Sequence, residues 1–236
     1  MLLFHGTSEY AAMQALKVGL RPRGQTGVSN WQFESNKDSV YLTDTYACHY
    51  ALNAKQNGVR IPGPNGKVHN RMAVIEVDTS RLPFTGFRAD EDFLAFREAY
   101  SDTGAGKTVT DLVTHHSANL TTEWKLSLKL LGTCSFADTI SPRHFTRIAL
   151  FDVKTNRDMA HAMMDGNVSP MAYKFAGHYH RAYTRWLFGE PVTALDMLGL
   201  AGLETIPDFE KPRIEYWEKN ILANRAGVEV INLKEK

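Results

Sequence analysis

The first eight residues constrain the fold most, because they join a strand to a helix through a short polar turn. Leu2-Leu3-Phe4 is an apolar run typical of a buried strand, and His5-Gly6-Thr7-Ser8 follows at once. Residues 9–19 then carry apolar side chains at helical spacing, with Ser8 placed to cap the helix. The strand end brings an imidazole, a glycine backbone and two hydroxyls together, which suits a small polar ligand. A plain strand, turn and helix cap would use the same residues.

The order of the remaining elements predicts an α+β fold in which short strands from the whole chain form a sheet. Expected strands are residues 40–42, 72–78, 133–136, 147–153 and 228–233. Expected helices are residues 46–56, 93–100, 121–131, 156–164, 171–188, 192–203 and 213–224. The expected elements change near residue 155 from mixed strands and helices to mainly helices. This change predicts a core over residues 1–154 and a mostly helical C-terminal extension over residues 155–236. The last strand can rejoin the sheet, which would make the extension part of the same domain.

Composition limits the environment and the partners of the chain. The formal net charge is +1, so no global field attracts nucleic acid or an acidic membrane. Cys48 and Cys134 are the only cysteines and do not make a disulfide framework, so we expect a cytoplasmic protein. No apolar run is long enough to span a membrane. The pairs His115-His116 and His178/His180 have no cysteine or acid at ligand spacing, so we expect no metal.

Four short motifs follow one another at compatible spacing. They are His5-Gly6-Thr7, Gly19-Leu20-Arg21, Val40-Tyr41-Leu42 and a later helix that contains Tyr50. Their order resembles the ADP-ribosyltransferase fold, in the His-Tyr-Glu branch that includes diphtheria toxin and the poly(ADP-ribose) polymerases. The resemblance covers residues 2–55 well and residues 72–153 loosely. It implies a split β-sheet core that binds NAD as a co-substrate.

The resemblance also implies roles for the residues at the strand end and for two tyrosines. His5 would bond a ribose hydroxyl of NAD, and the backbone of Gly6 would bond the carboxamide of nicotinamide. Thr7 would support the ribose or the turn. Tyr50, and in a second position Tyr41, would stack on the nicotinamide ring. Ordinary core packing is the rival interpretation for both tyrosines.

Two arginines are candidates for the phosphates of NAD. Arg21 would approach the pyrophosphate or the adenine side, and Arg23 is a second phosphate candidate, because a guanidinium offers forked donors to phosphate oxygens. Solvated surface charges are the rival interpretation for both.

The acid of the signature is the weakest part of the resemblance. The branch carries a catalytic Glu at the start of a later strand, where it stabilises positive charge on the ribose as nicotinamide leaves. Residues 131–136 look like that strand and contain no Glu. Asp138 and Glu123 are the nearest acids, and Asp90-Glu91-Asp92 is a further source. We expect an acid to act there, with Asp138 ahead of Glu123. Alternatively, Thr133 or Ser135 occupies its place.

The resemblance implies a mono-ADP-ribosyltransferase, a glycosyltransferase that cleaves NAD at the nicotinamide–ribose bond. Its acceptor would be a protein or a nucleic acid, and a toxin or a phage-encoded factor that modifies a host would fit by analogy. An NAD-dependent RNA 2′-phosphotransferase is an alternative, although such enzymes carry a second His where Tyr41 stands. A catalytically dead module that binds NAD or nucleic acid is another. Residues 173–186 interleave basic and aromatic side chains, which is the place to look for an acceptor contact, although a solvated basic helix face is favoured.

Overall fold

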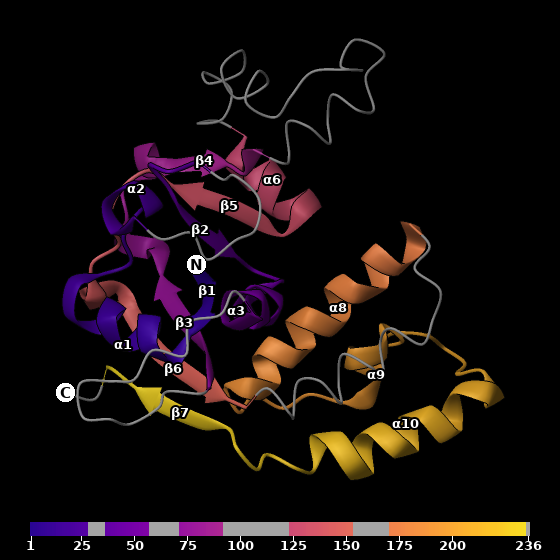
Figure 1. The fold of residues 1–236 in the computed structure, drawn as a ribbon. Coiled ribbons are helices and arrows are strands. Elements are labelled where there is room, and N and C mark those ends of the chain that lie inside the picture. The colour runs from indigo at the N-terminus through magenta and orange to yellow at the C-terminus, as the bar shows by residue number, and fades with distance from the viewer. Residues whose placement is uncertain (28–35, 57–70, 92–122, 153–169, 235–236) are drawn as a thin grey trace.

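The computed structural model of the protein describes residues 1–27, 36–56, 71–91, 123–152 and 170–234. The helices expected at residues 93–100 and 156–164, Asp92 and the His115-His116 pair lie outside these ranges. The described residues form an α+β fold, with one seven-stranded sheet and helices packed on both of its faces (Figure 1).

The sheet has the strand order β4-β5-β2-β1-β3-β6-β7, and all neighbouring strands run antiparallel. In that order the strands are β4 (Phe87–Ala89), β5 (Thr133–Phe136), β2 (Val40–Thr43), β1 (Leu2–Ser8), β3 (Met72–Asp78), β6 (Phe145–Phe151) and β7 (Glu229–Asn232). β1 pairs with β3 along its whole length, from Leu2 opposite Asp78 to Ser8 opposite Met72. Within the described residues, β1 pairs with β2 only where Phe4 lies opposite Thr43. The pairing between β1 and β2 is therefore much shorter than the pairing between β1 and β3.

The helices divide between the two faces of this sheet. They are α1 (Glu9–Val18), α2 (Arg23–Thr26), α3 (Ala47–Gln56), α6 (Trp124–Leu131), α8 (Pro170–Leu187), α9 (Ala194–Leu198) and α10 (Lys211–Trp217), which continues as a π turn (Glu218–Leu222). One hydrophobic core takes its helical side chains from α1 and α6, and the other from α3, α8, α9 and α10.

Strand β3 is the centre of both cores. Ala73, Ile75 and Val77 pack into the first core, while Met72 and Val74 pack into the second. Successive side chains of a strand point to opposite faces, so a strand covered on both sides must be apolar at almost every position. This is why the sequence of β3 predicts its bounds so well.

The C-terminal part belongs to the same sheet and core as the rest. β7 pairs with β6, with Ile231 opposite Ile148, so the last strand does join the sheet. Tyr183 and Trp217 are fully buried in the core that α3 also lines. The segments before and after residue 155 therefore share a hydrophobic core.

Other expectations need smaller corrections. No strand is expected between residues 78 and 133, yet β4 lies there and is defined by its pairing with β5. The helix expected over residues 192–203 is only α9, because Gly199 adopts a left-handed conformation and ends it. Cys48 and Cys134 are buried free thiols. Among the described helices, none has the length and apolar character needed to cross a membrane.

Helix α8 contains the basic and aromatic residues of segment 173–186. Tyr179, Tyr183 and Trp186 are buried, while Arg181 and Arg185 are exposed. The aromatic rings thus face the core, and the described part of the helix presents a basic face to solvent. This matches the favoured interpretation of the segment.

Candidate functional site

Helix α3 crosses β1 directly at Gly6. A Cβ atom at Gly6 would lie 1.8 Å from the carbonyl oxygen of Ala47 and 2.6 Å from the amide nitrogen of Ala51. Because real side chains do not approach backbone so closely, only glycine fits. Packing against α3 is therefore sufficient to require the glycine of the His-Gly motif. The same close approach brings α3, with partly buried Tyr50, onto the strand that carries His5.

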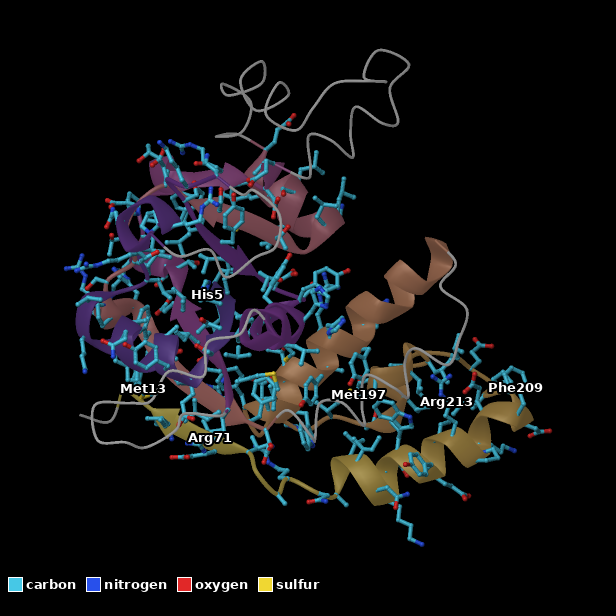
Figure 2. All side chains as sticks on the ribbon, in the orientation of Figure 1. His5, Met13, Arg71, Met197, Phe209 and Arg213 are labelled. Atoms are coloured by element: carbon cyan, nitrogen blue, oxygen red, sulfur yellow. The ribbon has the colours of Figure 1, made fainter. Side chains whose placement is uncertain are left out.

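The ring of His5 is held in one tautomer by the neighbouring strand. Its Nδ1 lies 2.9 Å from the carbonyl oxygen of Tyr41. A carbonyl can only accept, so Nδ1 carries the hydrogen and donates it. Burial lowers the pKa of His5, which favours the neutral ring and leaves Nε2 as an acceptor. His5 lies among the strands of the sheet (Figure 2) and is suited to accept a hydrogen bond from a ligand hydroxyl.

Tyr41 and Glu91 meet at the centre of the site. The Tyr41 hydroxyl donates to Oε1 of Glu91. The backbone N–H of Asn36 donates to the Tyr41 hydroxyl at 2.8 Å and to the same carboxylate oxygen at 2.9 Å. Burial and the nearby negative charge of Glu91 raise the pKa of Tyr41 well above its usual value, so the hydroxyl stays protonated. Glu91 itself is only 7% exposed.

Glu91 is positioned through the backbone of its neighbour Asp90. The Asp90 N–H donates to the Ser127 hydroxyl at 3.1 Å, and that hydroxyl donates to the carbonyl of Thr133 at 2.8 Å. Ser127 is fully buried on α6, so a single side chain ties the end of β4 to the start of β5. The Glu91 carboxylate therefore follows a junction that these two hydrogen bonds hold in place.

A second hydroxyl fixes the strand that carries Tyr41. The Oγ of Thr43 accepts from the backbone N–H groups of Thr45, at 2.9 Å, and Tyr46, at 2.7 Å, just before α3 begins. It donates to the carbonyl of Gly132 at 2.5 Å. The end of β2, the start of α3 and the turn before β5 are thus joined at one buried atom.

The acids ranked first from the sequence occupy other positions. Asp138 is exposed in the turn after β5, where its Oδ1 accepts from the N–H of Thr139 at 2.6 Å. This is the common use of Asp in a turn. Glu123 is partly buried just before α6. Among the described hydrogen bonds, neither carboxylate reaches His5 or Tyr41. The acidic cluster at residues 90–92 did point to Glu91, but nothing in its sequence singles out that member.

The position expected for a Glu in β5 holds small hydroxyl residues. Ser135 lies opposite Tyr41, and Thr133 lies opposite Thr43. Both are buried, and the Ser135 hydroxyl lies 3.5 Å from the carbonyl oxygen of Ala89, to which it donates. Ser135 therefore links β5 to β4 beside the Tyr41–Glu91 contact.

The remaining predicted residues have structural partners of their own. Thr7 is buried and pairs with β3 opposite Ala73. Arg21 is exposed, and its Nε donates to the carbonyl of Val18 at 3.3 Å. Arg23 begins α2 and is partly buried. Gly19, the first residue of the Gly19-Leu20-Arg21 motif, ends α1 with a φ of 85°.

Within the residues that the structure describes, no group of three or more His, Cys, Asp or Glu side chains is arranged to hold a metal ion. The site consists instead of a neutral imidazole, a phenol and a carboxylate from separate elements, with a tyrosine-bearing helix across the strand end. Comparison with models of known protein families and with curated proteins found no match to this chain.

Proposed function

We propose that the protein is a mono-ADP-ribosyltransferase that cleaves the nicotinamide–ribose bond of NAD and transfers ADP-ribose to a macromolecular acceptor. The observation that carries this proposal is the linked set of His5, Tyr41 and Glu91. The His5 ring bonds the backbone of Tyr41, and the Tyr41 hydroxyl bonds Glu91. These are the three residue types of the His-Tyr-Glu signature, and they come from β1, β2 and the segment just after β4.

Each group has a role in this chemistry. The Nε2 atom of His5 accepts a hydrogen bond from a ribose hydroxyl. Tyr41 and Tyr50 contact the nicotinamide ring, whose position the Gly6 backbone helps to set. The carboxylate of Glu91 stabilises the positive charge that develops on the ribose as nicotinamide leaves. Glu91 takes the role for which the sequence favoured Asp138 or Glu123.

The sheet order supports an acid that enters from a neighbouring strand. β5 lies next to β2 and carries Ser135 opposite Tyr41, where the signature would suggest a Glu. β4 lies next to β5, and Glu91 follows it by two residues. The carboxylate thus reaches Tyr41 from one strand further along the sheet.

Incubation of the purified protein with NAD labelled in the adenine ring tests the proposal. Nicotinamide release is measured by chromatography, and label transfer is measured on protein and nucleic acid from a cell lysate. Release accompanied by transfer supports the proposal. NAD binding without release above background would favour the dead binding module, and release that depends on a 2′-phosphorylated RNA would favour the phosphotransferase.

A further inference from the structure

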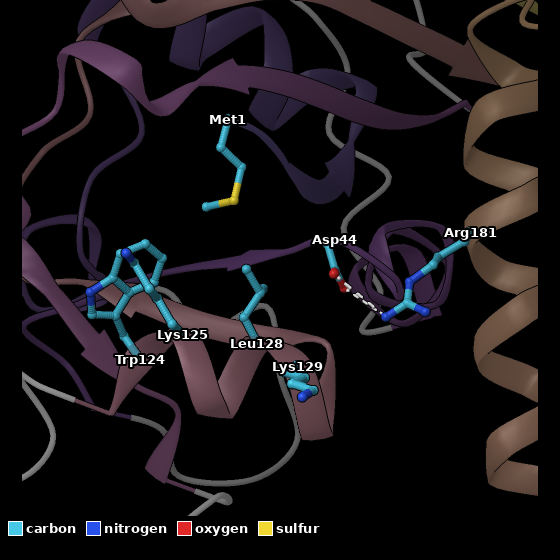
Figure 3. Close-up of a pocket in the computed structure, with 7 residues that line it drawn as sticks. All are labelled: Met1, Asp44, Trp124, Lys125, Leu128, Lys129 and Arg181. Carbon is cyan, nitrogen blue, oxygen red and sulfur yellow. Dashed lines mark hydrogen bonds and ion pairs between the residues drawn. The ribbon is translucent and has the colours of Figure 1, made fainter.

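A cavity of about 480 Å³ lies between α6, the turn after β2 and α8 (Figure 3). Its charged lining consists of Lys125 and Lys129 from α6, Arg181 from α8 and Asp44 from the turn. None of the residues assigned to the NAD site lines it, so the cavity needs an explanation of its own.

The two lysines form a pair of positive charges that no carboxylate of the described residues compensates. They lie four residues apart on one face of α6, a spacing at which like charges repel. α6 contains no acidic residue, and within the described chain neither ammonium forms an ion pair with a carboxylate. The Lys125 ammonium lies over the rings of Phe84 and Trp124, at 5.6 and 5.5 Å from their centroids. An anion placed in the cavity would relieve the repulsion.

Among the described residues that line the cavity, the one carboxylate is already engaged. Asp44 pairs with Arg181, which also lines the cavity, at 3.4 Å (Figure 3). This ion pair joins the turn after β2 to α8, so Asp44 does not neutralise the charge of the two lysines. The net positive character of the lining is therefore local, because the whole chain carries only +1.

The rest of the lining is apolar. It consists of Met1, Trp124 and Leu128. Trp124 and Leu128 are 6% and 7% exposed, so these side chains are fixed by the core, whereas Met1 is 54% exposed and can adjust to a ligand. Cations beside an apolar surface suit a ligand that joins a phosphate to a ring system.

We propose that this cavity binds a nucleotide unit of single-stranded nucleic acid. Lys125 and Lys129 contact phosphate oxygens, and the sugar and base lie against Met1, Trp124 and Leu128. The small number of cations predicts recognition of one or two phosphates rather than of a long duplex. This proposal stands on residues separate from the NAD site and holds whether or not the protein cleaves NAD.

Fluorescence anisotropy with a 5′-fluorescein-labelled oligothymidylate tests the proposal on the full chain. The test variant is Lys125→Gln/Lys129→Gln. The control is Lys17→Gln/Lys219→Gln, which removes the same charge from exposed positions outside the cavity. Thermal unfolding of both variants checks that the fold is intact, which is expected because all four lysines are exposed.

The test variant should bind about 25-fold more weakly at 0.1 M salt, because affinity for single strands varies with salt to the power of about −0.7 per neutralised phosphate. The slope of log affinity against log salt should become shallower by about 1.4 in the test variant and stay unchanged in the control. An abasic strand of the same length should bind at least about fivefold more weakly to the wild type, because base contacts are lost. Equal losses in the two variants, or no binding by the wild type, would overturn the proposal.

Discussion

The hydroxyl of Tyr41 donates to the carboxylate of Glu91, which lies 50 residues later in the chain. Tyr41 belongs to β2 and Glu91 follows β4, and β5 lies between these two strands. The Tyr41–Glu91 contact therefore spans β5. At this level of the sheet, Ser135 of β5 lies opposite Tyr41 of β2 on one side and Arg88 of β4 on the other. Residues opposite one another share a face of the sheet, so the small side chain of Ser135 leaves room for the two larger groups to meet.

Replacement of Glu91 by Gln should remove the charge while keeping the size and the hydrogen-bonding capacity of the side chain. We expect kcat for nicotinamide release to fall by about 10²- to 10³-fold, because charge stabilisation in the transition state is lost. The KM for NAD should change much less. Steady-state kinetics of Asp138→Asn provide the control, which should match the wild type. A fully active Glu91→Gln protein would exclude this carboxylate from the reaction.

Replacement of Tyr41 by Phe should keep the ring and remove the hydroxyl. Glu91, which is buried, loses a donor, so the free energy of unfolding should fall by about 1–3 kcal/mol. Urea unfolding measures this change. Tyr216→Phe is the matched control, because Tyr216 is 57% exposed and its loss of a hydroxyl should have little effect. Equal stability of the two variants would show that the Tyr41–Glu91 contact contributes nothing.

Replacement of Gly6 by Ala should destabilise the fold severely. The new methyl group would lie 1.8 Å from the Ala47 carbonyl oxygen, so α3 would have to move away from β1. We expect a loss of about 3 kcal/mol or more in unfolding free energy. Gly27→Ala is the control, because its added atom meets nothing within 4 Å and its φ of 71° predicts a cost of only about 1 kcal/mol. A Gly6→Ala protein as stable as this control would contradict the close helix–strand approach.

The stability of the protein should depend on His180 in mildly acidic solution. Burial on α8, followed by the charge of nearby His49, lowers the pKa of His180 to about 3. Its ring also packs against Tyr46 and Tyr179. Below about pH 6.5, His180 is therefore protonated in the unfolded chain but stays neutral in the folded chain. Its contribution to stability is fully present above that pH and is lost as the pH falls. As the pH falls from 6.5 to 4, stability should decrease with a slope that approaches about 1.4 kcal/mol per pH unit from this group.

Urea unfolding of wild type and His180→Gln between pH 4 and pH 7 measures this slope. The other histidines remain in both proteins, so the difference between the two curves reports on His180. The variant should lose less stability on acidification than the wild type. Parallel curves would show that His180 titrates normally in the folded protein.

Local patterns in the sequence predict several elements closely. The apolar run of β3 and the short strand β5 were predicted with their observed bounds, Met72–Asp78 and Thr133–Phe136. Helix α1 begins after Ser8, whose side chain accepts from the N–H of Ala11 as expected of a cap. In contrast, β4 has three residues and too little periodicity to be recognised, because it depends on pairing with β5.

The sequence by itself determined a strand at residues 2–4, the tyrosine on the next strand and the tyrosine on the helix after it, because periodicity acts over neighbouring residues. The turn expected at residues 5–8 is wrong, because pairing with β3 extends β1 to Ser8. Only the tertiary structure decided which acid joins them. Asp138 and Glu123 flank the strand that was expected to carry it, but hydrogen bonds through Ser127 and Asn36 bring Glu91 to Tyr41 from another strand. Contacts between distant segments depend on how the strands are ordered in the sheet, and that order is set by packing of the whole chain rather than by any local pattern.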